Sequence, residues 1–424
     1  MKKDPRTATS GRSLLEPHRE EIVRCVKCGS CRAVCPSFLH TQAESFSARG
    51  RIALVKAVLD GRLAASEIYR DRLATCTSCL ACEAACASSV PVTAIIQAAK
   101  EAAVEEAGTG LISSIVAGVL KNDVLLRAAA WLAPFALHYA AGSVKGGPAE
   151  RSGFAEKPAP PRKEARSARS RERVVFFPGC AVTHFQHDIA AAVVKVLTAL
   201  GCDVVIPEGL KCCGRPLLSL GDRRAAEELA LHNSRLLSGL DVDAVITACA
   251  SCGLTFKKDY PKLLPPGTKK PEVLDIHEFL RGRLSTLRFA SVERRITVHD
   301  PCHLGRGQGL SQTVRDVLAA VPGLKVVEMQ NADRCCGFGG VMRVTHRSLS
   351  AGIAEEKAKT IIATGAGEVA AACPGCRMQI ADALRNAGSE AVVVHPVQIL
   401  AEALASRAEC EVSSAEWETV MQKK

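Results

Sequence analysis

The sequence predicts a multidomain protein in which a small helical domain precedes a duplicated α/β domain rich in cysteine. Three observations carry this prediction. Eight cysteines in the first quarter of the chain form two runs with the same spacing, residues 142–173 hold almost no large apolar side chain, and the sequence from Arg173 onward repeats itself. A chain of 424 residues is long enough for two or three domains with ordinary cores.

Each N-terminal run has the spacing C-x2-C-x2-C-x3-C, which is the pattern of bacterial ferredoxins that bind two [4Fe-4S] clusters. A cubane cluster needs four converging thiolates, and in such pairs the fourth cysteine of each run binds the other cluster. The spacing therefore predicts two ligand sets, which are Cys25, Cys28, Cys31 and Cys86 for the first cluster and Cys76, Cys79, Cys82 and Cys35 for the second. Two zinc sites are the alternative, since C-x2-C also suits zinc, but two closely packed runs of four cysteines favour clusters.

Helical patterns surround both runs. Apolar residues recur at helical spacing within Gly50–Leu59, between the runs, and a second helical pattern extends from Val92 to about Ala107. We therefore expect residues 1–103 to form an α-helical ferredoxin domain rather than the small β-rich kind.

Composition and charge exclude several classes of protein. Twenty cysteines would suggest disulfides in a secreted chain, but no apolar segment follows the basic start MKKDPRTATSGR. We therefore expect no signal peptide, a cytoplasmic location and cysteines that bind metal. The formal net charge of +11 lies largely in one linker, and aromatic residues make up only 4% of the chain, so we expect no nucleic-acid binding. An acidic partner or an anionic lipid surface fits this charge at least as well.

Residues 104–141 form a predicted helical spacer, which is apolar from 111 to 141. Polar residues interrupt every run of 18 apolar residues, so we expect no transmembrane helix. Helices that pack within this protein or its complex are the plainer expectation, and contact with a membrane surface is the alternative. Residues 142–173 are rich in Gly, Pro, Ser and Arg and predict a flexible basic linker.

The second half of the chain consists of two copies of one unit, at 174–290 and 291–408, followed by a tail at 409–424. Cys180, Cys212 and Cys249 of the first copy recur as Cys302, Cys335 and Cys373 at a nearly constant interval, so the duplication keeps its register. Each copy alternates short apolar runs with helical patterns, at 187–200, 222–239, 312–320 and 350–363. This alternation predicts an α/β fold with cysteines at the carboxyl ends of strands, the edge at which such sheets bind ligands.

Each copy contains five cysteines in the order C…CC-G…C-x2-C, a set that we call a pentad. The first pentad is Cys180, Cys212, Cys213, Cys249 and Cys252, and the second is Cys302, Cys335, Cys336, Cys373 and Cys376. A vicinal disulfide is strained, and a backbone that wraps a metal or cluster, with Gly permitting the tight turn, explains adjacent cysteines better. Buried inert cysteines together with a zinc ion are the alternative.

Five further residues near these cysteines are less informative. His299 and His303 flank Cys302, and His184 follows Cys180, so each is a candidate ligand or proton relay, with a structural histidine as the plainer reading. Cys202 and Cys410 belong to neither pattern and are expected to be ordinary thiols.

This order of cysteine runs, helical spacer, linker and two CCG repeats resembles the iron–sulfur subunit of glycolate oxidase (glycolate dehydrogenase). It also resembles the related subunits of D-lactate dehydrogenase, anaerobic glycerol-3-phosphate dehydrogenase and heterodisulfide reductase. The resemblance covers residues from about 20 to 405, and the RGRI stretch within Ala48–Ile52 favours the glycolate oxidase branch. The chain departs from the family pattern at Ala87, where proline is usual. Complete pentads hold noncubane [4Fe-4S] clusters in heterodisulfide reductase, so the resemblance also permits additional clusters here.

The chain has no G-x-G-x-x-G fingerprint, and no residue set that could take a hydride from an alcohol. The resemblance implies that a separate partner chain binds FAD, oxidises glycolate or D-lactate, and passes electrons to this chain. A membrane quinone or a soluble carrier would then accept the electrons, with peripheral attachment to the inner face of the cell membrane. A catalytic subunit like that of heterodisulfide reductase is the rival hypothesis, and a scaffold that delivers iron–sulfur clusters is a third.

Overall fold

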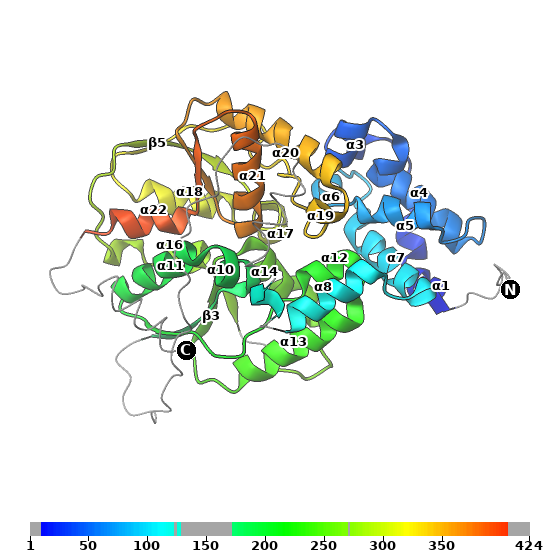
Figure 1. Ribbon diagram of the computed structural model, residues 1–424, viewed down its shortest axis with the longest axis horizontal. Coiled ribbons are helices and arrows are strands. Elements are labelled where there is room, and N and C mark those ends of the chain that lie inside the picture. The colour runs from blue at the N-terminus through cyan, green and yellow to red at the C-terminus, as the bar shows by residue number, and fades with distance from the viewer. Residues whose placement is uncertain (1–9, 123–124, 129–171, 270–271, 406–424) are drawn as a thin grey trace.

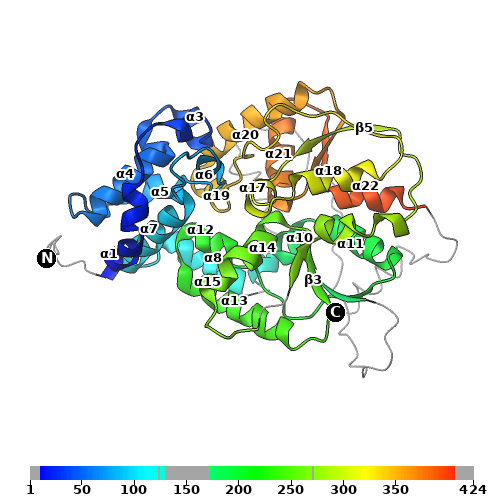
Figure 2. The same ribbon diagram turned by 180° about the vertical axis from the view of Figure 1, so that it is seen from behind.

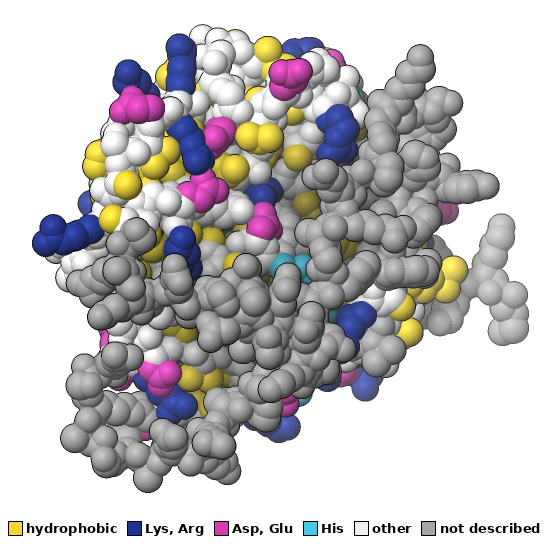
Figure 3. Space-filling view, turned by 60° about the vertical axis from the view of Figure 1, so that its left-hand side comes forward, with side chains coloured by type: hydrophobic (Ala, Val, Ile, Leu, Met, Phe, Trp, Pro, Cys, Tyr) yellow, Lys and Arg dark blue, Asp and Glu magenta, His cyan; other side chains and the backbone are white. Residues whose placement is uncertain are grey.

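The computed structural model describes residues 10–122, 125–128, 172–269 and 272–405. A helical N-terminal domain lies beside one end of two α/β units, as the views from both sides show (Figures 1 and 2). On the face shown in Figure 3, Lys and Arg side chains stand among Asp and Glu, so the described part of this face carries charges of both signs.

The N-terminal domain is built from short helices around the two cysteine runs. The helices are α1 (Ser10–Leu15), α2 (Arg19–Val23), α3 (Pro36–Thr41), α4 (Ala48–Leu59), α5 (Glu67–Ala74), α6 (Ala81–Ala84), α7 (Val92–Ala107) and α8 (Leu111–Lys121), with 3-10 turns at Glu16–His18, Ser30–Arg32 and Glu44–Phe46. The hydroxyl groups of Ser47 and Ser66 accept hydrogen bonds from backbone N–H groups in the first turns of α4 and α5, as N-cap serines do. The apolar faces of α1, α4, α5 and α7 meet in one core. The helical expectation for this domain is confirmed.

The first repeat is a parallel sheet in the order β2-β1-β3-β4. Its strands are β1 (Arg173–Phe177), β2 (Asp203–Val205), β3 (Ala244–Thr247) and β4 (Val273–Asp275). Its helices are α10 (Gly179–Phe185), α11 (His187–Ala199), α12 (Arg215–Leu220), α13 (Arg223–Ser238), α14 (Ala250–Leu254), α15 (Tyr260–Leu263) and α16 (Ile276–Arg281), with a π-helical turn at Thr255–Asp259 and a 3-10 turn at Leu284–Thr286. Helices cover both faces of the sheet, which is why β1 and β3 read as continuous apolar runs.

The second repeat has the same topology, with a parallel sheet in the order β6-β5-β7-β8. Its strands are β5 (Arg294–His299), β6 (Leu324–Val326), β7 (Glu368–Ala371) and β8 (Val392–Val394). Its helices are α17 (Gly305–Gln308), α18 (Ser311–Ala319), α19 (Met342–Thr345), α20 (Arg347–Ile362), α21 (Pro374–Asn386) and α22 (Pro396–Ala403). The predicted duplicated α/β fold is therefore confirmed, and a cysteine-bearing segment follows the carboxyl end of each central strand.

The two repeats face each other through reciprocal contacts. The Gln186 side chain of the first repeat donates to the Pro374 carbonyl of the second (2.9 Å), and Gln308, at the equivalent position of the second repeat, donates to the Ala250 carbonyl of the first (3.0 Å). Likewise α11 packs on α22 while α16 packs on α18. Equivalent surfaces that meet in this way define an approximate two-fold axis between the repeats.

The N-terminal domain contacts both repeats. Helix α3 packs on α20 of the second repeat, whereas α7 and α8 pack on α12 of the first. The Lys100 ammonium donates to the Ser219 carbonyl (3.0 Å), and the His346 imidazole bonds the Asp71 carboxylate (2.9 Å). The helical domain is thus fixed against the repeats from two sides.

The predicted apolar spacer is helical in its described part. Ala117 and Leu120 of α8, and Leu126 after it, join the core of the first repeat, while Leu111 and Ile115 of α8 are exposed. Packing within the protein is therefore confirmed for one face of α8. No single helix of the described residues is long and apolar enough to span a membrane; α7 and α8 reach that length together but are bent by 106° at their junction. Trp131, Leu132 and Phe135, which the sequence offers as further apolar surface, and the basic linker lie outside the described residues, except for its last two positions.

The glycine after each pair of adjacent cysteines has a left-handed backbone, with φ of 91° at Gly214 and 85° at Gly337. A side chain is disfavoured in this conformation. At Gly337 a Cβ atom would also lie 2.7 Å from the Ser350 carbonyl oxygen, whereas at Gly214 the nearest atoms, in Ala226, are 3.5 Å away. The two turns are alike in conformation and differ in the space around them.

We predict that Gly337→Ala destabilises the protein more than Gly214→Ala does. Both variants carry a backbone cost of about 1–2 kcal/mol, and only Gly337→Ala adds a clash with a backbone oxygen. Anaerobic thermal unfolding of the two variants, compared with the unmodified protein, measures the difference. Equal losses of stability would show that the Ser350 contact is unimportant.

Candidate cysteine-lined metal centres

One pocket of the N-terminal domain is lined by Cys25, Cys28, Cys31 and Cys86, and also by Cys82 of the second predicted set. The first three lie on the loop between α2 and α3, and Cys86 arrives from the end of the second run. The structure thus gathers the four cysteines that the sequence analysis assigns to the first cluster. Their role as ligands remains a prediction.

The second set of four gathers on the side of this domain that faces the repeats. Burial raises the pKa of the Cys82 thiol, and the neighbouring Cys79, Cys76 and Cys35 thiols raise it further. Cys35, which comes from the first run, is thus close to the second run, and it also lies near Cys31 of its own run, whose pKa is raised first by burial and then by the Cys35 thiol. Four thiols so close together are costly to ionise unless a cation compensates them, and binding to iron supplies that compensation.

A buried arginine supports this second group. Arg51 is only 1% exposed, and its guanidinium lies 3.9 Å from the Cys35 sulfur. The same group donates to the hydroxyls of Ser37 (3.1 Å) and Thr75 (2.9 Å) and to the Arg72 carbonyl (2.8 Å). Its charge is therefore held next to the predicted second cluster, where it favours added negative charge.

A buried lysine lies near the same group. Burial lowers the pKa of Lys100 to about 8, and the nearby Cys76 thiol partly opposes that shift. The sequence analysis missed both cations. Arg51 stood in the RGRI stretch, but nothing in the sequence indicates that its side chain is buried.

The first pentad forms a continuous row of sulfur atoms between β1, β3 and α12. The Cys180 and Cys212 sulfurs are 3.5 Å apart. Cys213 is in hydrogen-bonding contact with Cys212 and Cys252, and Cys252 with Cys249. The structure thus brings together all five residues that the sequence pattern grouped.

The second pentad repeats this arrangement. Its Cys336 and Cys376 sulfurs are 3.3 Å apart. Cys335 is in contact with Cys302 and Cys336, and Cys376 with Cys373. All five sulfurs again form one group.

Two further contacts join the separate groups into one row. Cys249 of the first pentad contacts Cys373 of the second, and because these residues are equivalent in the two repeats, they meet close to the approximate two-fold axis. Cys79 of the N-terminal domain contacts Cys335 of the second pentad in a small buried cluster. The described cysteines therefore run from the second cluster site through the second pentad to the first.

His303 lies where the three domains meet. Its imidazole bonds the Ser251 hydroxyl of the first repeat (3.0 Å) and the Ser78 carbonyl of the N-terminal domain (3.3 Å). Both ring nitrogens are thus engaged, which agrees with a structural role. His184, on α10, is half-buried.

His299 differs from the other two histidines. Nδ1 bonds the Ala332 carbonyl (3.1 Å), whereas the buried Nε2 has no hydrogen-bond partner. A ring nitrogen of His299 and the sulfurs of Cys336 and Cys376 lie within 4.8 Å of one another. Burial, with the nearby Lys357 charge, lowers the pKa of His299 to about 3, so the ring is neutral at pH 7.

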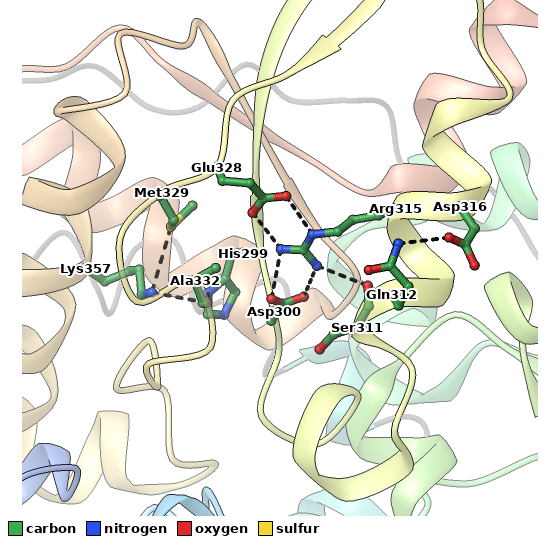
Figure 4. A network of polar contacts seen from close by, with 10 residues as sticks. All are labelled: His299, Asp300, Ser311, Gln312, Arg315, Asp316, Glu328, Met329, Ala332 and Lys357. Atoms are coloured by element: carbon green, nitrogen blue, oxygen red, sulfur yellow. Dashed lines mark hydrogen bonds and ion pairs between the residues drawn. The ribbon is translucent and has the colours of Figure 1, made fainter.

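A polar network that the sequence analysis missed holds the segment around His299 in place (Figure 4). The Arg315 guanidinium forms paired bonds to the Asp300 carboxylate (2.8 and 3.0 Å) and to the Glu328 carboxylate (2.6 and 2.8 Å). Lys357, only 1% exposed, donates to the carbonyls of Asn331 (2.6 Å) and Ala332 (3.3 Å). No sequence pattern marks this lysine, because it lies on an otherwise ordinary helix.

The two remaining cysteines stand apart from these groups. Cys202 is buried between α11 and β2, and burial raises the pKa of its thiol to about 11, which agrees with a buried thiol that binds no metal. Cys410 lies outside the described residues.

The donor sets fit iron–sulfur clusters. Two groups of four cysteines match the ligand count of two cubanes. Each pentad offers five sulfurs, which is one more than a tetrahedral zinc ion uses. A cluster with more than one iron therefore suits a pentad better than a single zinc ion does.

Comparisons with known proteins agree with this division of the chain. A family model described as "4Fe-4S dicluster domain" matches residues 21–90, and one described as "Cysteine-rich domain" matches residues 174–257 and 296–381. The chain is 31% identical to lactate utilization protein A 2 of Bacillus mycoides over 237 residues, which cover 54% of this chain and 98% of that protein.

Two further relatives are similar over most of both chains. One is the probable glycolate oxidase iron-sulfur subunit of Bacillus subtilis, 29% identical over 90% of this chain and 94% of the relative. The other is a subunit of the dihydromethanophenazine:CoB–CoM heterodisulfide reductase of Methanosarcina acetivorans, 28% identical over 91% and 94%. The chain also matches a subunit of the fumarate reductase (CoM/CoB) of Methanothermobacter marburgensis at 39% identity but spans only 43% of that protein.

We predict that Arg51→Met lowers the reduction potential of the cluster held by Cys35, Cys76, Cys79 and Cys82. Removal of a buried positive charge disfavours the more negative, reduced state, by on the order of 50 mV. Potentiometric titration followed by electron paramagnetic resonance measures the shift. The control is Arg62→Met, since Arg62 is an exposed arginine paired with Asp60.

The variant Arg51→Lys separates charge from folding. It keeps the positive charge while losing part of the hydrogen bonding, so the potential should stay closer to that of the unmodified protein. An Arg51→Met protein that folds and titrates without a shift would contradict the proposed electrostatic role.

Proposed function

We propose that this chain, which belongs to the cysteine-rich (CCG) iron–sulfur family of oxidoreductase subunits, serves a flavin-dependent 2-hydroxy-acid dehydrogenase acting on glycolate or D-lactate. The single observation that carries this proposal is the continuous row of cysteines from the N-terminal domain into both repeats. In this proposal an FAD-binding partner subunit oxidises the substrate, and this chain conducts the electrons away.

We assign the ligands as the sequence and the geometry group them. Cys25, Cys28, Cys31 and Cys86 hold one [4Fe-4S] cluster, Cys76, Cys79, Cys82 and Cys35 hold a second, and each pentad holds a further iron–sulfur centre. When bound, such centres accept and release one electron at a time.

The protein residues set the order and the environment of these centres. The Cys79–Cys335 contact supports an order in which the second pentad follows the second ferredoxin cluster, and the Cys249–Cys373 contact supports the first pentad as the next centre. Arg51 and Lys100 offset the negative charge of the second cluster site. This order favours passage of electrons along one row rather than between separate sites.

A catalytic role like that of heterodisulfide reductase is the second candidate. Both pentads are complete, and they meet at Cys249 and Cys373. In this alternative the pentad centres themselves reduce a disulfide substrate. The similarity to the heterodisulfide reductase subunit is as extensive as that to the glycolate oxidase subunit.

The exposed apolar face of α8 supports a peripheral contact with the inner face of the cell membrane. Leu111 is 77% exposed and Ile115 is 56% exposed. The basic linker could add attraction to anionic lipid of about 1 kcal/mol for each charge near the surface. A membrane quinone would then be within reach as the electron acceptor.

The activity of the complex tests the proposed function. We expect the chain, isolated together with its partner, to contain flavin and to reduce a dye when glycolate or D-lactate is added. A preparation that lacks flavin and ignores both acids would contradict the proposal. Cluster-dependent reduction of a thiol disulfide without a flavoprotein would instead support the heterodisulfide-reductase-like role.

Metal content tests the ligand assignment. The eight N-terminal cysteines account for about eight iron and eight sulfide per chain, so we expect anaerobically prepared protein to exceed both numbers. Cys28→Ser and Cys79→Ser should each remove one cluster signal from the reduced protein, while Cys202→Ser should remove none. An iron content that stays near eight atoms per chain would contradict clusters in the pentads. Clusters that transfer readily to apo-proteins would favour the role of a delivery scaffold.

Cell fractionation tests the membrane contact. We expect the complex to sediment with membranes at low salt and to be released at high salt, because screening weakens attraction to lipid. Leu111→Gln combined with Ile115→Gln should weaken the association, and Val344→Gln, which changes an exposed apolar residue of α19, is the control. A complex that stays soluble at low salt and reduces no quinone analogue would indicate that a soluble carrier accepts the electrons.

A further inference from the structure

The two pentads occupy equivalent places but have different neighbours at one position. Phe177 is the last residue of β1, and its strand partner in β3 is Thr247. His299 is the last residue of β5, with Ala371 as its strand partner in β7. The two side chains therefore stand at the same position of the two sheets, next to the first and the second pentad respectively.

Phe177 offers no donor atom to the first pentad. Its ring packs edge-on against Phe256, with centroids 4.8 Å apart, in the same core as Cys212 and Cys213. The surroundings of the first pentad at this position are thus apolar.

His299 brings a nitrogen atom to the second pentad instead. The Ala332 carbonyl can only accept a hydrogen bond, so Nδ1 carries the proton and Nε2 carries a free lone pair. Nε2 is buried and has no other partner, and the side chain is 1% exposed. An imidazole fixed by a backbone carbonyl at one nitrogen and free at the other has the arrangement of a metal ligand.

The surroundings hold the ring in this state. The Ala332 carbonyl also accepts the backbone N–H of Asp300 (3.0 Å) and the Lys357 ammonium (3.3 Å), and Asp300 is itself clamped by Arg315 (Figure 4). The Ala332 carbonyl and the backbone that carries His299 are therefore both held in place. The ring cannot turn to pair Nε2 elsewhere without breaking this network.

We propose that Nε2 of His299 is a ligand of the iron–sulfur centre in the second pentad, beside Cys336 and Cys376, and that the first pentad is ligated by sulfur alone. This proposal rests on the proposed function only in assuming that the pentads hold iron. An imidazole is a neutral ligand, so a thiolate at the same place would make the second centre more negative and harder to reduce.

The test uses the full chain, expressed with ring-15N-labelled histidine and purified anaerobically. Pulsed electron paramagnetic resonance of the partly reduced protein should show a strong 15N coupling to a centre other than the two ferredoxin clusters. The coupling should vanish in His299→Phe, which copies the residue of the first repeat, and persist in His303→Gln. Iron above eight per chain without this coupling would overturn the proposal and leave the electron-transfer function intact.

A second variant keeps the proposal testable if His299→Phe does not fold or if the centre gives no paramagnetic signal. His299→Cys offers a thiolate at the same place, so it should keep the iron and shift the potential of one centre downward in direct electrochemistry. Unchanged potentials in both variants would overturn the ligand role. Iron that stays at eight, or stoichiometric zinc in the second pentad, would overturn it as well, whatever the activity of the complex with its flavoprotein.

Discussion

The main constraint on this structure is that many cysteine thiolates are buried side by side. A thiolate is an anion, and in a low-dielectric interior neighbouring anions raise one another's pKa values. Eighteen cysteines fall into the two ferredoxin runs and the two pentads, so the fold must supply compensation at each group. Bound metal would supply such compensation, and among the described residues Arg51, Lys100 and Lys357 are buried cations that the protein adds. The three-way packing of the domains, which covers Cys79 and Cys335, makes this compensation necessary.

Much of the fold follows from local patterns that can be read in the sequence. The continuous apolar strands, the helical periodicity between them and the constant interval between equivalent cysteines were sufficient to predict two α/β repeats. Helix α7 covers the predicted segment from Val92 to Ala107. The spacing rule also assigns Cys86 to the first cluster and Cys35 to the second, and this ligand exchange stays a prediction.

What the sequence did not reveal lies between elements far apart in the chain. The Cys79–Cys335 contact and the bonds of His303 join three domains, and no local pattern encodes them. Burial of Arg51 and Lys357 was equally hidden, since both occur in helices where a charged residue normally faces solvent. The free nitrogen of His299 becomes apparent only when the Ala332 carbonyl, from a distant loop, is seen to occupy the other one.

The reciprocal bonds of Gln186 and Gln308 carry an evolutionary consequence. An interface in which each half makes the same contacts is what two identical single-repeat chains form when they dimerise. In a homodimer every substitution appears twice, so the last position of the first strand would be the same on both sides. Two repeats within one chain can differ, and a phenylalanine in one with a histidine in the other is a difference that a homodimer of a single repeat could not maintain.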